Sequence, residues 1–290
     1  MAGIATNRTN IALPTEVSQE ILSKTQEASA VMSLARQIAL PGRGLTIPVI
    51  TADPEASWVD ETAEKPVSNP GLDTKVMQAY KLAVIVPFSN EFRRDAAALY
   101  DELVRRLPLA LAQKFDATVF GNGTAPGNNF DTFAAVTAQD ISTDAYAGLV
   151  AADSDIATHG GVMNGIALSP QGKGVLLAAV DDNKRPLFIN NVAEGAVPMV
   201  LGARTVISKG AYKAGTSPAP NEVGVAGDWS QAMYGTVEGV VIDYSSDASI
   251  TSGNQTINLF QRNMFAVRAE IEVGFRADTT VFNRLTAASS

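Results

Sequence analysis

Residues 89–123 read SNEFRRDAAALYDELVRRLPLALAQKFDATVFGNG, and this stretch decides the fold that the sequence predicts. Its apolar side chains recur every three or four residues, the spacing that places them on one stripe of an α-helix. The stripe consists of Phe92, Ala96, Leu99, Leu103, Leu107, Leu111 and Phe115. Ser89 is suited to cap the start of this helix, and Gly121 and Gly123 are suited to end it. One long helix of roughly 45 Å is therefore expected, at about 1.5 Å per residue.

Pro108 lies inside this helical pattern. Proline removes one backbone donor and crowds the preceding turn, so a kink or a break is expected near Leu107. A break would give two ordinary core helices instead of one long helix. Both alternatives are compatible with the sequence.

The composition limits the classes of function. The chain has 290 residues, of which 46% are hydrophobic, so it can bury a sizeable core in one large or two smaller domains. Its 22 Lys and Arg against 30 Asp and Glu give a net charge of −8, which disfavours nucleic-acid binding as the main function. The chain has no cysteine, which excludes disulfides and cysteine chemistry, and its single histidine leaves little for a zinc site. The start lacks a signal peptide and no apolar run is long enough to span a membrane, so a soluble protein that is not exported is expected.

The chain before the helix predicts an arm followed by an extended hairpin. Residues 14–39 carry apolar side chains at helical spacing, whereas residues 44–50 and 72–88 have the pattern of strands around a polar loop. In the second strand one face is expected to contain Leu72, Thr74, Val76, Tyr80, Leu82, Val84 and Val86. A hairpin of this length is hard to bury within its own domain, with Trp58 and Val59 near its tip, so a neighbouring chain is its simplest cover. Alternatively, Trp58 packs beneath a local loop.

The chain after the helix alternates short helices and strands. A helix is expected over residues 143–158, with Tyr146, Leu149, Val150 and Ile156 facing inward. The other expected elements are a buried strand at 165–168, a helix at 171–180, a strand at 199–208, a loop at 214–227, and strands at 239–244 and 255–275. This order indicates an α+β chain with two sub-domains.

The candidate chemical groups do not form an active site. His159 is placed to cap the end of a helix, and the glycines at 121, 123 and 127 are expected to form a turn, because no Gly-Lys-Ser/Thr follows them. Three carboxylate pairs could bind calcium or act as acids and bases: Asp60 with Glu61, Asp153 with Asp155, and Asp181 with Asp182. None of them has the spacing of a calcium loop, so solvated surface is expected. The sequence predicts no catalytic residue, no cofactor and no metal, and therefore no enzyme.

Several segments, taken in order, resemble the major capsid protein family of tailed double-stranded DNA bacteriophages, which has the Hong Kong 97-type capsid fold. ASWVDETAEKPVS resembles the tip of its extended loop, KLAVIVPFSNEFRRDA its return strand entering the spine helix, and FDATVFGNGTAPGN the end of that helix. IALSPQGKGVLLAAVDDNKRPLF and MVLGARTVIS resemble elements of its axial domain. GDWSQAMYG resembles its Gly-Asp-aromatic turn, and NMFAVRAEIEVGFRADTTVFNRL its closing strand.

The resemblance implies an α+β fold of four parts. These are an N-terminal arm at 1–41, an extended β-hairpin loop at 42–84, a peripheral domain with the long spine helix at 85–134 and 256–290, and an axial domain at 135–255. The resemblance further implies self-assembly into hexamers and pentamers that form an icosahedral head around phage double-stranded DNA, without sequence-specific binding and without a membrane. It places the protein in the virion after assembly in the host bacterial cytoplasm.

The resemblance also suggests partners and contact residues. A portal protein would occupy one vertex of the head. Because the arm starts about a dozen residues after Met1, no fused scaffold is expected, and a separate scaffolding protein, or none, is implied. A decoration protein is a further possible partner. The expected inter-subunit contacts are Trp58, Val59, Asp60, Glu61, Lys65, Arg93, Arg94 and Arg268. Some family members cross-link subunits through a lysine, yet no partner can be matched to Lys65 or Lys75.

Two other classes of protein stay open at the level of the sequence. An encapsulin, a bacterial compartment with the same fold, would enclose an enzyme cargo instead of DNA. A carboxylate-dependent hydrolase or a sugar-binding module would need a cleft with converging acids, and would stay a small monomer.

Overall fold

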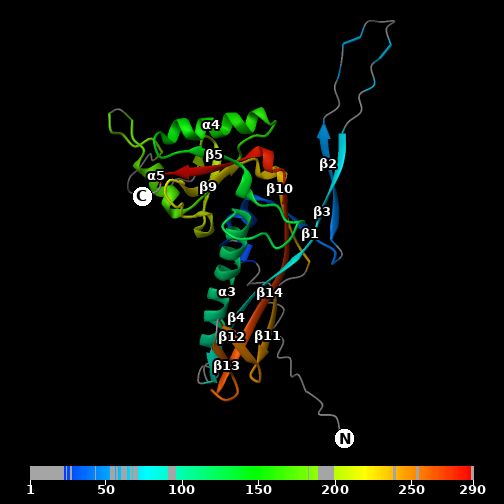
Figure 1. The fold of residues 1–290 in the computed structure, drawn as a ribbon, viewed down its shortest axis with the longest axis vertical. Coiled ribbons are helices and arrows are strands. Elements are labelled where there is room, and N and C mark those ends of the chain that lie inside the picture. Colours follow the sequence, from blue (N-terminus) through cyan, green and yellow to red (C-terminus); the bar gives the residue numbers. More distant parts are fainter. Residues whose placement is uncertain are drawn as a thin grey trace.

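The computed structural model describes residues 23, 25–26, 28–42, 44–52, 56, 58–59, 64–65, 67, 71–90, 96–181, 183–188, 199–237, 240–252 and 255–288. Figure 1 shows a long helix, α3, beside one sheet, with a second sheet beyond its C-terminal end and a hairpin that projects away from both. None of the described helices is both long and apolar enough to cross a membrane.

The long helix is continuous. α3 (Ala96–Val119) runs through Pro108 without interruption, so the break expected near Leu107, and with it the alternative of two shorter helices, is wrong. The C-terminal part of the stripe predicted from the sequence is buried, since Leu107, Leu111 and Phe115 are at most 2% exposed, whereas Phe92 lies outside the described residues. The helix ends at a glycine, as expected: Gly121 has φ +85°, and a Cβ there would lie 2.7 Å from Ala134.

A five-stranded sheet packs against α3. Its central strand β14 (Met264–Ala277) pairs along one edge with β4 and along the other with β10 and then β11, while β1 extends the sheet in parallel beside β10. The bounds are β1 (Arg36–Ala39), β4 (Tyr80–Ser89), β10 (Ala232–Thr236) and β11 (Val241–Ser245). Side chains of β4 alternate between partly buried and exposed, and Leu82, Val84 and Val86 pack with Leu107 and Leu111 of α3. The face predicted for this part of the strand is confirmed.

The extended hairpin consists of β2 (Leu45–Ala52) and β3 (Gly71–Met77), paired antiparallel. The strand expected over 72–88 is interrupted at Gln78 and Ala79, so β3 and β4 belong to different sheets. The interruption reverses the inward face: Thr74 and Val76 are exposed in β3, whereas Met77 is fully buried. The single face expected for the whole stretch is therefore wrong in β3.

A six-stranded sheet forms the second layer of the molecule, in the order β5-β15-β9-β6-β8-β7. Its strands are β5 (Thr137–Asp140), β6 (Gly165–Leu168), β7 (Met199–Val200), β8 (Ala203–Ile207), β9 (Asn221–Gly227) and β15 (Phe282–Ala287). Helices α4 (Ala145–Thr158) and α5 (Pro170–Ala178) pack against it, and Figure 1 shows α4 along one side. Leu149 and Ile156 of α4 are buried as expected, but Tyr146 and Val150 are 52% and 41% exposed, so their predicted inward position is wrong.

Two segments differ in the type or extent of the expected element. The helical pattern of residues 14–39 ends in the short helix α2 (Ala30–Leu34), after which β1 is a strand; residues 14–22 lie outside the described residues. The strand expected at 199–208 is a hairpin of β7 and β8, with positive φ at Leu201 and Gly202 in the turn.

The glycine-rich segment 214–227, for which the sequence predicts a loop, contains β9, a buried strand with neighbours on both edges. Its glycines are needed for close packing: a Cβ at Gly224 would lie 2.6 Å from the Ala167 carbonyl oxygen, and one at Gly227 would overlap the Phe282 ring. Phe282 in turn stacks on Phe133 with ring centroids 4.5 Å apart. Tertiary contact therefore overrides the local turn signal.

The pairing of β15 bears on the domain division. The predicted division groups residues 256–290 with the spine helix, yet β15 pairs in parallel with β5 and antiparallel with β9 in the six-stranded sheet. The remaining described elements are the hairpin of β12 (Ser249–Ser252) and β13 (Gln255–Asn258) and the short 3-10 helices η2 (Phe133–Ala135), η3 (Lys209–Ala211), η4 (Trp229–Gln231) and η5 (Thr279–Val281). The predicted domain boundaries themselves stay a prediction.

Candidate assembly surfaces

The hairpin carries apolar side chains that its own chain does not cover. Trp58 is 105% exposed and Val67 is 86% exposed, while Val59 is 37% exposed and Lys65 is also exposed. The alternative that Trp58 packs beneath a local loop is therefore wrong. A fully exposed tryptophan is uncommon on a monomer, because its large apolar surface is stabilised by burial. The remaining residues predicted at this tip, Asp60 and Glu61, lie outside the described residues.

Two hydrogen bonds attach the base of the hairpin to β14, and one of them comes from an arginine that also forms a half-buried ion pair. The Arg276 side chain is 11% exposed, and its Nη1 lies 2.7 Å from Asp131 Oδ1. Arg276 Nε donates to the carbonyl oxygen of Val76 in β3 at 2.8 Å, and Lys75 Nζ donates to the carbonyl oxygen of Ala277 at 3.1 Å. Lys75, a lysine of the extended loop without a matched cross-linking partner, therefore contacts its own chain.

Arg268 lies on the exposed face of the same strand. Its guanidinium pairs with Asp243 of β11 and, at 3.3 Å, with Glu270. The hydrogen bond with Asp243 raises the pKa of Arg268 above its ordinary value, and the nearby Glu270 carboxylate adds to the shift. Arg268 is predicted to contact another subunit, and within the chain it is an exposed member of a small charged cluster. Arg93 and Arg94 lie outside the described residues.

Asp116 forms a buried junction that sequence reasoning missed. This α3 residue is fully buried, and its carboxylate accepts hydrogen bonds from the hydroxyls of Ser29 and Ser208 and from the backbone N–H groups of Ala30 and Val31. It thereby joins α2, α3 and the segment before η3. Burial raises the pKa of Asp116, while these four hydrogen bonds act in the opposite direction. The sequence offers one signal for this burial: Asp116 directly follows Phe115, the last residue of the apolar stripe of the helix.

The Gly-Asp-aromatic turn is held by Asp228. Its carboxylate accepts hydrogen bonds from the backbone of Val162 at 3.1 Å, the Asn164 side chain at 2.7 Å, and Ser230. Burial opposes ionisation, but the hydrogen bonds outweigh it and lower the pKa of Asp228 below its ordinary value of 3.8. The adjacent Trp229 is buried and donates its Nε1–H to the Gly165 carbonyl oxygen at 3.0 Å. The turn therefore fixes η4 to the start of β6.

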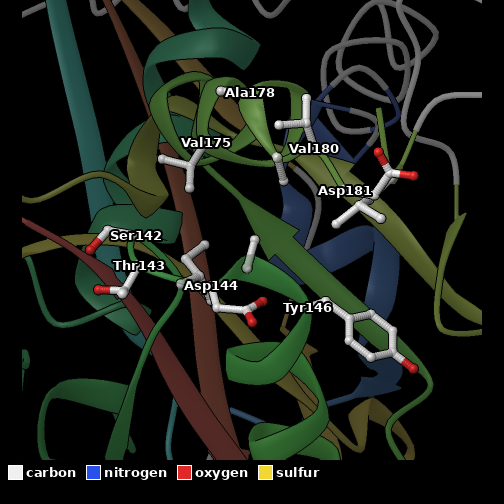
Figure 2. Close-up of a pocket in the computed structure, with 12 residues that line it drawn as sticks. Ser142, Thr143, Asp144, Tyr146, Val175, Ala178, Val180 and Asp181 are labelled. Atoms are coloured by element: carbon white, nitrogen blue, oxygen red, sulfur yellow. The ribbon is translucent and has the colours of Figure 1, made fainter. Parts of the chain in front are cut away.

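A pocket of about 760 Å³ lies between the start of α4 and the end of α5 (Figure 2). Two acidic residues line it, Asp144 and Asp181, and Figure 2 shows that their carboxylates do not point toward each other. Asp144 accepts from the N–H of Ala147 as the cap of α4, and Asp181 accepts from two N–H groups of its own loop. Both carboxylates thus serve local backbone, and the pocket lacks the converging acids that a glycosidase or a sugar-binding site requires.

The other candidate groups are structural where they are described. His159 is the C-cap of α4, with its Nδ1 2.8 Å from the Asp155 carbonyl oxygen, as its position in the sequence indicates. Within the described part of the chain, no group of three or more His, Asp or Glu side chains could hold a metal ion. Of the remaining carboxylate pairs, Asp153 is exposed and Asp155 half-buried, and Asp182 lies outside the described residues.

Solved structures of phage chains share the overall fold. The chain of Gordonia phage Cozz superposes with a TM-score of 0.70 at 22% identity, covering 90% of this chain and 87% of its own. The chain of Mycobacterium phage Bobi gives a TM-score of 0.71 at 19% identity, covering 100% of this chain and 96% of its own. The fold is therefore that of phage capsid chains, and the predicted Hong Kong 97-type fold class is confirmed.

Sequence comparison places the chain within one family. The model of the phage capsid family matches residues 9–278. The probable major capsid protein of Mycobacterium phage L5 is 29% identical over 94% of this chain and 89% of its own length. This chain belongs to the phage capsid family.

Proposed function

We propose that this chain is the major capsid protein of a tailed double-stranded DNA phage, and that its copies assemble through hexamers and pentamers into an icosahedral head. The family membership and the names of the curated relatives support the first statement. The observation that carries the second is the fully exposed Trp58 on a hairpin that projects from the body (Figure 1). A neighbouring copy is the partner that a shell supplies at every position.

The energetic argument rests on the area that Trp58 leaves uncovered. A tryptophan buries roughly 150–250 Å² when fully covered. At about 25 cal/mol per Å², that area corresponds to about 4–6 kcal/mol as an upper bound for each contact. Hot spots of interfaces are enriched in tryptophan for this reason. Because every subunit repeats the contact, even half of that energy would be a large term in the stability of a shell.

Charged residues would set the register of the contacts between subunits. We assign this role to Asp60, Glu61, Lys65, Arg93, Arg94 and Arg268, with Val59 beside Trp58 in the apolar contact. Rim charges steer association and exclude incorrect pairings more than they add affinity. The net charge of −8 favours a shell that encloses DNA without binding its sequence.

The same proposal sets the partners and the place of action. A portal protein would occupy one vertex, and scaffolding and decoration proteins are further candidate partners. Assembly would occur in the cytoplasm of the host bacterium, and the product would be part of the virion. The role is structural, and the arm, extended hairpin, peripheral domain and axial domain are the proposed parts of the subunit.

The test is to express the chain alone and to examine it by size-exclusion chromatography and negative-stain microscopy. Closed shells, or rings of five and six subunits, are expected. A monodisperse 30.4 kDa monomer at high concentration would contradict the proposal. Shells that co-purify with an enzyme cargo would instead favour an encapsulin-type compartment.

The variant Trp58→Ala tests the anchor. Trp58 is fully exposed, so the thermal stability of the unassembled subunit should not change, whereas the shell should lose thermal stability or fail to close. Trp58→Phe is the matched control, because it keeps an aromatic side chain and should retain most of the shell stability. Shells of Trp58→Ala as stable as the wild type would remove Trp58 from the interface.

A further inference from the structure

The extended hairpin meets the body of the subunit over a narrow base. In the described part of the chain β2 and β3 pair only with each other, and β3 is separated from β4 by the two residues Gln78 and Ala79. A hairpin attached in this way does not have its direction fixed by a continuous sheet. Its direction must be set by contacts at the base.

Arg276 makes the central contact at that base. Its guanidinium donates through three nitrogens to three groups: Nε to the Val76 carbonyl oxygen at 2.8 Å, Nη1 to Asp131 at 2.7 Å, and Nη2 to Asn129 Oδ1 at 3.0 Å. Arg276 is in β14, Val76 in β3, and Asp131 and Asn129 in the segment that follows α3. One side chain therefore links the hairpin to both the sheet and the turn after the spine helix.

Further hydrogen bonds hold the groups that Arg276 contacts. Asp131 accepts from the backbone N–H of Ala277 at 3.1 Å, and its own N–H donates to the Phe275 carbonyl oxygen at 3.2 Å. The Asn129 side chain donates to Gln78 Oε1 at 3.3 Å. Asp131 is thus held on β14, and Asn129 is held on the linker of Gln78 and Ala79 between β3 and β4. Two of the three groups that Arg276 contacts are therefore themselves fixed by further hydrogen bonds.

The backbone is packed closely at the same place. A Cβ at Gly274 of β14 would lie 2.5 Å from the Gln78 carbonyl oxygen, and one at Gly44 would lie 2.8 Å from the Met77 carbonyl oxygen. Only glycine allows the chain to approach this closely on both sides of the linker. The base is therefore a packed joint and not a loose tether.

We propose that Arg276 is a positioning residue for assembly, which sets the angle of the extended hairpin and so the point where Trp58 meets the next subunit. This inference rests on the proposed function. A fully extended chain advances about 3.3 Å per residue, so the 13 steps from Leu45 to Trp58 span at most about 43 Å. At that radius, a rotation of about 10° at the base displaces the tip by up to about 7.5 Å, which is enough to lose a specific contact.

The geometry requires arginine in particular. The guanidinium is a planar fork that donates in several fixed directions, whereas a lysine ammonium is a single point charge on a flexible stem. Lysine at position 276 keeps the charge beside Asp131 but cannot reach Val76 and Asn129 as well. The variant Arg276→Lys therefore removes the geometric role while keeping the ion pair.

Hydrogen exchange on the unassembled subunit tests the joint directly. Arg276→Lys should accelerate exchange of the β2 and β3 amides at least tenfold, while the backbone amides of the paired strands β4 and β14 stay protected. The matched control is Arg268→Lys, on the same strand, where the arginine is exposed and also pairs with an aspartate, Asp243; it should leave exchange unchanged. Unchanged exchange of the hairpin in Arg276→Lys would overturn the proposal.

Microscopy of the assembled products tests the consequence. Arg276→Lys should give open or irregular shells of several diameters under conditions in which the wild type gives one diameter. Uniform shells in spite of faster hairpin exchange would also overturn the proposal. If the wild type forms no shells, the proposed function fails, and the exchange experiment still decides whether Arg276 holds the hairpin.

A second variant covers the case in which Arg276→Lys disrupts the fold. If the β4 and β14 amides also lose protection, Asn129→Ala replaces it in both assays, because this change removes the hydrogen bonds of the Asn129 side chain with Arg276 and Gln78 and leaves the ion pair of Arg276 with Asp131 intact. Faster exchange confined to the hairpin, together with irregular shells, is the expected result. Wild-type behaviour in both assays would refute the positioning role.

Discussion

Replacing Asp116 should destabilise the subunit more than replacing an exposed carboxylate such as Asp144. The perturbation is Asp116→Ala, in the spine helix. The carboxylate is fully buried and accepts from two backbone N–H groups, of Ala30 at 2.9 Å and Val31 at 3.3 Å, and from the hydroxyls of Ser29 and Ser208. These donors come from α2 and from the segment before η3. Loss of the carboxylate that joins them to α3 should therefore loosen all three parts of the chain at once.

The expected magnitude follows from the donors that the variant leaves without an acceptor. The two serine hydroxyls can rotate toward other acceptors, but the two N–H groups at the start of α2 cannot. An unsatisfied buried donor costs about 1–3 kcal/mol, so two of them cost about 2–6 kcal/mol. At about 2 °C per kcal/mol for a chain of this size, the midpoint of thermal unfolding should fall by about 4–12 °C.

Thermal unfolding of the unassembled subunit measures this change, and Asp144→Ala is the matched control. Asp144 is an exposed cap of α4 with one hydrogen bond to a backbone N–H, and losing such a cap costs about 0.5–2 kcal/mol. Hydrogen exchange should also accelerate at Ala30–Leu34 in Asp116→Ala and stay unchanged there in Asp144→Ala. A midpoint for Asp116→Ala no lower than that of Asp144→Ala, with α2 still protected, would refute the reasoning.

Two further predictions concern a turn and a strand. The lowered pKa of Asp228 stabilises the folded chain above pH 3.8, and this contribution is lost as the pH falls through the folded-state pKa. The difference in unfolding midpoint between the wild type and Asp228→Asn should therefore be constant from neutral pH to about pH 5. It should shrink below about pH 4. A difference that does not change with pH would contradict this assignment. Gly227→Ala should unfold or aggregate, because its Cβ would overlap the buried Phe282 ring, whereas Gly174→Ala in α5, with no atom within 4 Å, should be neutral or stabilising by up to about 1 kcal/mol. Soluble expression and unfolding midpoints decide this pair, and equal stability of the two variants would argue against the packing described for β9.

The spine helix and the extended hairpin could be predicted because their signals are local. The spacing of Leu107, Leu111 and Phe115 indicates one buried face whatever that face contacts. The alternation of Leu82 and Val84 likewise indicates a strand with one face on a core. The order of such segments along the chain sufficed to identify the family resemblance. The sequence left two alternatives for Trp58, and its full exposure in the structure excludes burial beneath a local loop.

The errors in the prediction came from contacts between distant parts of the chain. The helix passes through Pro108, since the tertiary packing of Leu107 and Leu111 outweighs one lost hydrogen bond and the local clash. Residues 221–227 form a central strand in spite of their glycines, because the neighbouring strand and Phe282 come too close for a side chain there. Tyr146 and Val150 face solvent because the sheet covers the adjacent stripe of α4 instead.

The sequence by itself determined the α+β class of fold, the long helix and the hairpin, since each depends on the periodicity of neighbouring residues. Only the tertiary structure decided that Asp116 joins three segments and that Arg276 holds the base of the hairpin. The groups that these two side chains contact lie between 85 and 200 residues away along the chain. A buried charge becomes informative only when its hydrogen-bond partners are known, and no local pattern specifies partners that the fold brings together from such distances.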